Sequence, residues 1–371
     1  MKPIALRLVC LETRLAPAVA TWDGGGADNK WTTAANWAPD VVPQPGDDLV
    51  FPAGVAQLAN VNDFPAGTTF HSIAVNAVGY QLSGNAVALA AGLTFGDLTF
   101  PGRPEFGLPL ILTGDQAIDN SHAGPYLLTG PINLNGHALT FTTIYQGGTI
   151  AGDISGAGGV TFSGPLYTVS GHNTYTGPTV LTAGPYNINA LINLSGSIAG
   201  PVTVQGATLR STGGSVGDLT VTSGGLGNIS GFAESPISLT TGNLTLSDAA
   251  SVSTRLGASG SDKIVAVGNV HVAGTLNLYS ASFRPGQQFT IIDNDGTDPV
   301  VGTFSKVPNN PDVPNGGFSN APEGALLFLQ QFSNLALRIS YKGGDGNDVV
   351  LTAVALPSVL AVGAGAGACR S

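Results

Sequence analysis

Glycine recurs every few residues in the middle of the chain, and this spacing limits the fold more than any other feature. Between positions 147 and 184 the glycines separate short runs in which apolar and polar residues alternate, such as Val160-Thr161-Phe162. An alternation of period two is typical of a strand with one buried face, and glycine between such runs indicates tight turns. No window in this stretch is long enough for a helix. The pattern therefore predicts an all-β fold with essentially no α-helix.

The strand signal returns at a nearly constant interval along the chain. The expected strands begin at Val160, Val180, Val202, Leu219 and Ile237, which are 20, 22, 17 and 18 residues apart. A period near 20 that contains only strands and turns is typical of a β-solenoid, in which each turn of the coil stacks in parallel on the last. A two-sheet sandwich is the alternative, but it favours intervals of about 8–12 residues. The spacing therefore favours a single solenoid.

Composition and charge limit the partners that the chain can bind. Charged residues make up 10% of the 371 residues, and the net charge is -10. Such a chain has no basic stripe that could replace counterions on phosphates, so nucleic acid is not an expected partner. Anionic membrane surfaces are disfavoured for the same reason. The apolar share of 43% suffices for a core.

The two cysteines lie near the two ends of the chain, at Cys10 and Cys369. A structural disulfide between them is not expected. The body of the chain then contains no cysteine, which excludes thiol catalysis and cysteine-based zinc sites there.

Both ends of the chain differ from the repeats between them. Residues 1–20 combine a basic start, an apolar stretch and small residues before Thr21, which indicates an export leader; a short amphipathic segment is the alternative. The string L-E-T-R-L-A-P-A within it also resembles the leader of large surface and secreted proteins of planctomycete-type bacteria. Residues 353–371 form a small, apolar tail that is too interrupted for a membrane span. An extracellular or cell-surface location is therefore expected.

All three tryptophans lie in residues 21–54, at Trp22, Trp31 and Trp37. The terminal rung of a solenoid exposes an unpaired strand edge and an open core, and bulky aromatic residues can cover both. The alternative is an exposed aromatic platform that stacks on sugar rings. The uneven spacing of the tryptophans favours an N-terminal cap.

Two stretches resemble a known family. The first runs Y-T-V-S-G-H-N-T-Y-T-G-P-T-V-L-T-A-G (167–184), and the second is the opening W-D-G-G-G-A-D-N-K-W. Both resemble autotransporter-associated β-strand repeat proteins, although Pro178 stands where glycine is usual and only one full copy is present. The resemblance implies a right-handed parallel β-helix, here over residues 55–352 with a C-terminal cap. It also implies that the chain is similar to the passenger region of surface-displayed proteins, and it assigns no catalytic residues to this sequence.

One motif points to a metal. Residues 343–351, G-G-D-G-N-D-V-V-L, match a calcium-binding nonapeptide in which carboxylates supply hard oxygen ligands. Asp345 and Asp348 are the candidate calcium ligands, and no other cofactor is expected. Such sites form between stacked consecutive copies, and only one copy is present, so a ligand-free turn is the alternative. The acidic loop 293–298 misses the EF-hand spacing and indicates a solvated turn.

Little else in the sequence suggests catalysis. The G-x-S-x-G pattern at 213–217 lacks the helix that a nucleophile elbow needs, and the five histidines are at least fifteen residues apart. Asp153, Arg210 and Asp218 do not share one register near a period of 20. The sequence therefore predicts a non-enzymatic, exported structural or adhesin-like protein whose partner is a surface polysaccharide or another cell-surface protein. A polysaccharide lyase or glycosidase, or a sugar-binding module on the same scaffold, is the alternative.

Overall fold

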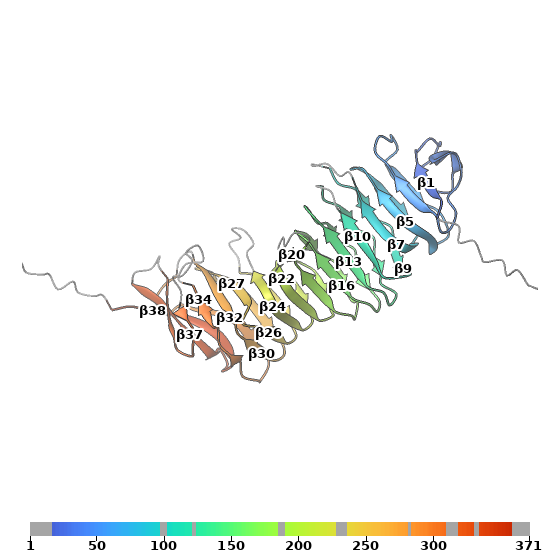
Figure 1. The fold of residues 1–371 in the computed structure, drawn as a ribbon. Coiled ribbons are helices and arrows are strands. Elements are labelled where there is room, and N and C mark those ends of the chain that lie inside the picture. The colour runs from blue at the N-terminus through green and yellow to red at the C-terminus, as the bar shows by residue number, and fades with distance from the viewer. Residues whose placement is uncertain are drawn as a thin grey trace, which may run out of the picture.

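The chain forms an elongated stack of parallel strands (Figure 1). The structure is a computed structural model that describes residues 17–96, 102–120, 124–184, 190–227, 236–280, 283–308, 318–329 and 334–357. These residues contain one 3-10 turn, η1 (Ala34–Asn36), and no α-helix. The predicted all-β parallel solenoid is confirmed.

Each turn of the coil contributes to three parallel ladders of strands, which are the three faces of the solenoid. Four long strands bend from one face to the next, and so belong to two ladders. Ladder 1 contains β1 (Val19–Trp22), β3 (Asp48–Phe51), β10 (Gln116–Asn120), β13 (Leu139–Thr143), β16 (Val160–Ser163), β19 (Thr179–Thr182), β26 (Leu244–Leu246), β30 (Val270–Val272) and β33 (Val301–Gly302), with parts of β5 (Thr68–Val75), β7 (Val87–Phe95), β22 (Val202–Ser211) and β24 (Leu219–Gly227).

The other two ladders follow the same order along the chain. Ladder 2 contains β4 (Ala59–Asn62), β6 (Gln81–Gly84), β8 (Glu105–Phe106), β11 (Leu127–Leu128), β14 (Thr149–Ile150), β17 (Tyr167–Val169), β20 (Ala190–Leu194), the second parts of β22 and β24, β27 (Ala250–Gly257), β31 (Thr275–Ser280) and β34 (Lys306–Val307). Ladder 3 contains the first parts of β5 and β7, β9 (Leu110–Leu112), β12 (Ile132–Asn133), β15 (Ile154–Ser155), β18 (His172–Asn173), β21 (Ser197–Ile198), β23 (Ser215–Val216), β25 (Ser238–Thr241), β29 (Lys263–Ala266) and β32 (Gln288–Asn294).

The core is a set of apolar rows that run along the stack. In ladder 1 the inward position passes from Phe141 to Phe162 to Leu181, which are Cα partners in successive rungs. All three side chains are buried, and the two phenylalanine rings stack with centroids 4.9 Å apart. One rung cannot bury its apolar face alone, so each apolar side chain is buried by stacking on the apolar side chains of the neighbouring rungs.

The register corrects two of the predicted strand starts. Val160 pairs with Thr179 and not with Val180, because Thr179 points inward and bonds the hydroxyl of Tyr175 in the core. A buried threonine shifts the apparent alternation by one residue. Ile237 does not continue the row of Leu219 either: Leu219 pairs with Leu244.

A tryptophan cluster closes the N-terminal end of the stack, the end at which Figure 1 labels β1. Strand β2 (Trp37–Ala38) pairs antiparallel with β1, and Trp22, Trp31 and Trp37 are completely buried. Their rings contact one another edge to face, at centroid distances of 5.3 and 6.2 Å, and also contact Phe51. The expected leader ended at residue 20, but β1 begins at Val19 and its Ala20 pairs with Leu49 of β3. Residues 1–16 lie outside the described part of the chain.

The C-terminal end changes from parallel to antiparallel pairing. Strand β32 pairs with β38 (Asp348–Ala355), which pairs with β37 (Leu335–Gly343), which pairs with β36 (Leu326–Phe328). Two short strands, β28 (Gly260–Ser261) and β35 (Phe318–Ser319), add antiparallel pairs to β27 and β34. Because β38 ends at Ala355, residues 353–355 belong to the cap and not to the predicted tail.

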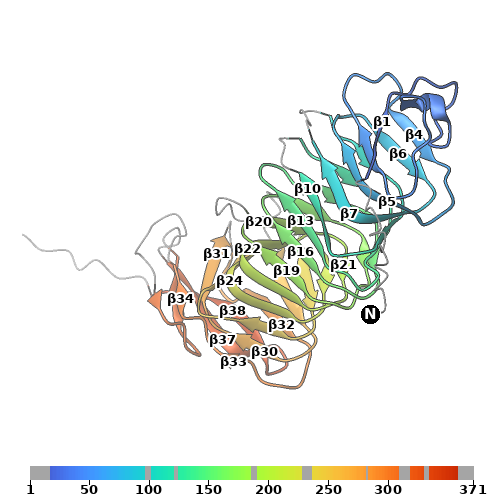
Figure 2. The ribbon, with the colours of Figure 1, turned by 45° about the vertical axis from the view of Figure 1, so that its right-hand side comes forward.

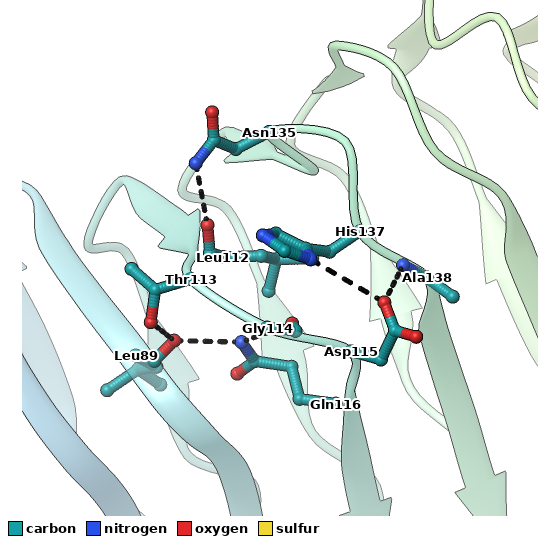
Figure 3. Close-up of polar contacts among 9 residues, drawn as sticks. All are labelled: Leu89, Leu112, Thr113, Gly114, Asp115, Gln116, Asn135, His137 and Ala138. Carbon is teal, nitrogen blue, oxygen red and sulfur yellow. Dashed lines mark hydrogen bonds and ion pairs between the residues drawn. The ribbon is translucent and has the colours of Figure 1, made fainter.

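Side chains in the turns bond each rung to the next (Figure 3). Asn135 Nδ2 donates to the carbonyl of Leu112 at 3.1 Å, and the Ala138 N–H donates to Asp115 Oδ1 at 2.9 Å. His137 Nδ1 lies 3.6 Å from the same carboxylate oxygen. These contacts satisfy backbone groups that a corner would otherwise expose, so the turns repeat in register with the strands.

Candidate binding surface

The outward positions of ladder 1 form a row of side chains parallel to the core, and all but one of those named below are polar. One row of Cα partners contains Thr140, Thr161, Val180, Thr203, Thr220, Thr245 and His271. Because neighbouring strands are about 4.8 Å apart, the row presents one side chain per rung at that spacing. Alternation along each strand therefore produces both the buried core and a regular hydroxyl-rich face.

Strands β24, β26, β30 and β33 are successive neighbours near the C-terminal end of this face, and Figure 2 labels β24, β30 and β33 in this part of the stack. The face is hollowed there. The groove there has a volume of about 590 Å³. Its polar lining comes from two rows, one on the strands and one in the turns that precede them, and from a loop after β32. The polar lining residues are Asp218, Thr220, Asn243, Thr245, Asn269, His271 and Asp298.

A ladder of side chains fixes the turn at one side of this groove. Asp218 Oδ1 accepts from the backbone N–H of Asn243 at 2.8 Å and from its Nδ2 at 3.1 Å. Asn243 Oδ1 in turn accepts from the N–H of Asn269 at 2.8 Å. The second oxygen of Asp218 has no partner among the described residues, and the Asp218 residue is exposed. One carboxylate oxygen therefore faces solvent from a rigid turn.

The loop of residues 295–300 forms the end wall of the groove, and two buried amides hold it. Asn294 Nδ2 donates to the carbonyl of Asp298 at 2.7 Å. Asn347, from the turn between β37 and β38, donates to the carbonyls of Gly296 at 2.6 Å and Asp298 at 3.3 Å. The side-chain oxygens of Asn294 and Asn347 are buried and have no partner in the structure. The acidic loop 293–298 and the turn that contains Asp345 and Asp348 are far apart in the sequence, and these hydrogen bonds bring them into contact.

The two predicted calcium ligands, Asp345 and Asp348, differ in their exposure to solvent. Asp345 is exposed, whereas Asp348 is buried and its Oδ1 accepts from the Asn294 N–H at 2.9 Å. Burial raises the pKa of Asp348; the Asn294 N–H lowers it, and the nearby Asp293 and Asp345 carboxylates raise it further. Within the described ranges, no three His, Cys, Asp or Glu side chains come together as a metal-binding group. Calcium binding at Asp345 and Asp348 stays a prediction.

The other residues that suggested chemistry are dispersed. Arg210 lies in ladder 2 between Asn193 and Gly227, and Asp153 precedes β15 in ladder 3, where its Oδ1 accepts from the His172 N–H at 2.7 Å. Asp218 precedes β24 in ladder 1, so these three charges do not form one site. Ser215 is in the parallel strand β23, which is not the strand-turn-helix of a nucleophile elbow.

Four of the five histidines can be placed, and three of them bond to a neighbouring rung. His71 Nδ1 lies 2.7 Å from Asp48 Oδ1, His137 pairs with Asp115, and His172 Nδ1 lies 2.5 Å from Ser197 Oγ. His271 is exposed in the groove, and His122 lies outside the described residues. The groove itself was missed in the sequence, because its lining residues lie in separate rungs.

The tryptophans do not form a sugar-stacking platform. The side chains of Trp22, Trp31 and Trp37 are fully buried, so none of the three indoles offers a face to a ligand. Their N–H groups are used inside the cap, for example from Trp31 Nε1 to Asn60 Oδ1 at 2.8 Å. The hypothesis of a binding module built on the tryptophan cluster is therefore wrong.

A comparison with known proteins finds that part of this chain is similar in sequence to one adhesin. No known protein-family profile matches the sequence. Over 90 residues, which are 24% of this chain, the sequence is 41% identical to the adhesin BmaC autotransporter of Brucella suis biovar 1 (strain 1330). The chain spans 2% of the length of that protein.

A solved structure also shows a loose likeness. The crystal structure of the Haemophilus influenzae Hap adhesin aligns with a TM-score of 0.31 and 12% sequence identity, covering 84% of this chain and 40% of that one. The part of the chain that the structure describes contains no helix with the length and apolar character of a membrane span. About a quarter of this β-solenoid is thus similar in sequence to a segment of a bacterial autotransporter adhesin.

Proposed function

We propose that this chain is a non-enzymatic, adhesin-like β-solenoid that is exported and attaches to a surface polysaccharide or to another cell-surface protein. The observation that carries the proposal is the outward row of ladder 1. Thr140, Thr161, Thr203, Thr220 and Thr245 stand in register on a continuous face. A solenoid of this kind displays many weak contact groups at fixed spacing, and many weak contacts on a rigid support bind by avidity.

The acidic, lysine-poor composition agrees with this proposal. With a net charge of -10, the chain is repelled by polyanions and by anionic membranes, so attachment must rest on hydrogen bonds and shape. The 90-residue similarity to an autotransporter adhesin supports attachment as the role. Export is part of the proposal and has its own test: protease shaving of the producing cells should cleave the chain at the surface, and a chain protected inside the cells contradicts it.

The attachment test uses the purified full chain coupled to fluorescent beads. Beads that carry the folded chain should be retained under flow on layers of bacterial cells or on polysaccharide-coated surfaces. Beads that carry the heat-unfolded chain or an unrelated acidic protein are the controls. Retention that does not exceed the controls on any layer overturns the proposal.

One observation favours a second candidate, a polysaccharide-cleaving enzyme. Asp218 and Asp298 are two exposed carboxylates that line one groove, and glycoside hydrolases work with a pair of carboxylates on either side of the scissile bond. The assay follows new reducing ends and unsaturated uronic acids during incubation with neutral and acidic polysaccharides. Sustained product release that is lost in both Asp218→Asn and Asp298→Asn makes the protein an enzyme.

A further inference from the structure

We infer that the groove between β24, β26, β30 and β33 is the binding site for a neutral polysaccharide chain. The inference rests on the proposed adhesin-like function and names the site and the ligand class for it. The groove is the place where the polar face of ladder 1 is hollowed, so a ligand there is contacted from a floor and from a wall.

The floor of the groove offers free hydrogen-bonding groups at a regular spacing. Thr220, Thr245 and His271 are Cα partners in three successive rungs, and their side chains make no hydrogen bond to other described residues. Each threonine hydroxyl can donate and accept, and so can a neutral imidazole. Groups that can both donate and accept a hydrogen bond suit sugar hydroxyls, because a sugar hydroxyl can also donate and accept.

The side of the groove adds a stronger acceptor. The free oxygen of Asp218 points from a turn that the Asn243 bonds already fix, so little side-chain entropy is lost when a ligand binds. A hydrogen bond from a sugar hydroxyl to this carboxylate is charge-assisted, and such bonds are about twice as strong as neutral ones. Asn269, which is exposed two rungs further along, can bond another hydroxyl of the same ligand.

The far end of the groove supplies an apolar contact. Val301 is 51% exposed, and Pro299 beside it is also exposed. Carbohydrate sites combine polar groups with an apolar patch, because one face of a pyranose ring carries C–H groups. The loop of residues 295–300, which Asn294 and Asn347 hold by hydrogen bonds, keeps Pro299 at a fixed place.

Charge and strand pairing disfavour two other classes of large ligand in this groove. Asp218 and Asp298 give the groove a negative charge, which opposes an anionic polysaccharide such as alginate. One way for a peptide to bind is to add a strand to a free sheet edge. The strands β24, β26 and β30 of the groove floor are each paired on both sides, so they offer no free backbone row for this mode, and β33 pairs with β30.

The test measures binding of the full chain to mannan, dextran and laminarin by calorimetry and by retention on immobilised polysaccharide. The variant Thr245→Arg places a bulky side chain on the groove floor. Its matched control, Thr168→Arg, makes the same change at an outward position of ladder 2, on another face of the solenoid and outside the groove. We expect Thr245→Arg to weaken binding by at least about tenfold, which corresponds to 1.4 kcal/mol, whereas Thr168→Arg binds as the natural chain does.

Two further results are expected. Asp218→Asn keeps the acceptor for the Asn243 N–H and therefore the turn, but removes the charge-assisted bond, so binding should weaken while the melting temperature is unchanged. Binding of a neutral chain should change little between low and high salt, because the ligand has no charge to screen. Alginate should not bind under any of these conditions.

The outcomes separate this inference from the proposed function. If beads with the natural chain and with Thr245→Arg are retained equally on cells, adhesion stands and the groove inference is overturned. If Thr168→Arg weakens polysaccharide binding as much as Thr245→Arg, the loss is not specific to the groove and the groove inference is overturned. If no polysaccharide binds and no bead is retained, both proposals fail.

Discussion

Asn347 donates a hydrogen bond of 2.6 Å from Nδ2 to the carbonyl of Gly296, although 51 positions separate the two residues. The turn at the end of the solenoid therefore supports the loop that walls the groove. The same amide reaches the carbonyl of Asp298 at 3.3 Å. A contact from the turn between β37 and β38 thus positions the groove, which is formed by the last parallel rungs.

Replacing this amide should loosen the wall. Asn347→Ala leaves the carbonyl of Gly296 without its partner and should lower the free energy of unfolding by about 1–3 kcal/mol. It should also weaken mannan binding, because the apolar patch at Pro299 loses its support. Asn193→Ala, on the outward row of ladder 2, is the matched control. Urea unfolding and binding are measured on all three proteins, and equal values for the two variants contradict this role of Asn347.

The stacked core should be sensitive to the loss of one ring. Phe162 is buried between Phe141 and Leu181, so Phe162→Ala leaves a cavity and should cost about 3–5 kcal/mol of unfolding free energy. Phe162→Leu should cost less, since it leaves a smaller void. Thr161→Ala, one position away and facing outward, should change stability by no more than about 0.5 kcal/mol. Denaturant titration with circular dichroism tests the order, and similar losses for Phe162→Ala and Thr161→Ala would sink the assigned register.

The tryptophan cap contains a buried polar pair that acts as a unit. Trp31 Nε1 donates to Asn60 Oδ1 at 2.8 Å, and both side chains are buried. Trp31→Phe leaves the amide oxygen without this donor and should destabilise the cap by about 1–3 kcal/mol. The double variant Trp31→Phe, Asn60→Leu removes both polar groups and should lose less than the sum of the single variants. Strict additivity in the double-mutant cycle contradicts the coupling.

Asp262 should make stability depend on pH in a defined direction. Burial raises the pKa of this carboxyl, while the N–H of Ile237 and the charge of Arg255 lower it in part. A folded pKa above the unfolded value of about 3.8 means that the folded state holds the proton more tightly. The ionised carboxylate therefore opposes folding above the folded pKa, and this cost disappears as the pH falls below the unfolded pKa.

The variant Asp262→Asn keeps an oxygen for the Ile237 N–H and removes the charge. Relative to the natural chain it should be more stable near neutral pH, and the advantage should shrink toward about pH 3. The control is Thr254→Val, whose lost hydroxyl bonded the Asp262 carbonyl at 2.7 Å and carries no titratable group. Its effect should not vary with pH. A constant difference between Asp262→Asn and the natural chain across this range rules the argument out.

The calcium hypothesis has a direct test. If Asp345 and Asp348 bind the ion, millimolar calcium should raise the melting temperature of the natural chain by mass action and not that of Asp345→Asn, Asp348→Asn. Asp348→Asn retains the oxygen that accepts from Asn294, which limits the loss of fold in the variant. A ligand-free turn predicts the same melting temperature with and without calcium. Asp295→Asn, an exposed change in the adjoining loop, is the control.

The arrangement of strands within one rung could be predicted from the sequence because it is local. Alternation in Val160-Thr161-Phe162 decides which side chains face the core, and glycine decides where the chain turns. The burial of all three tryptophans followed from the need of a solenoid to close its first rung. A single strand contains all the information for these choices.

Register between rungs could not be predicted in the same way. Successive partners in ladder 1 are 17 residues apart from Val204 to Val221 but 25 apart from Val221 to Leu246, so no fixed period aligns them. The inward-facing Thr179 further disguised the correct start of its strand. The length of each turn varies, and the pairing depends on the summed packing of every strand with both neighbours.

The sequence by itself determined the fold class, the buried faces and the aromatic cap, because each depends on the pattern within a short stretch. Only the tertiary structure brought Asp218, Asn243 and His271 to one groove and placed Asn347 behind its wall. The physical reason is that a groove is formed by residues from different turns of the coil. Their separation in the chain depends on loop lengths, whereas their separation in space depends on the stacking of rungs about 4.8 Å apart.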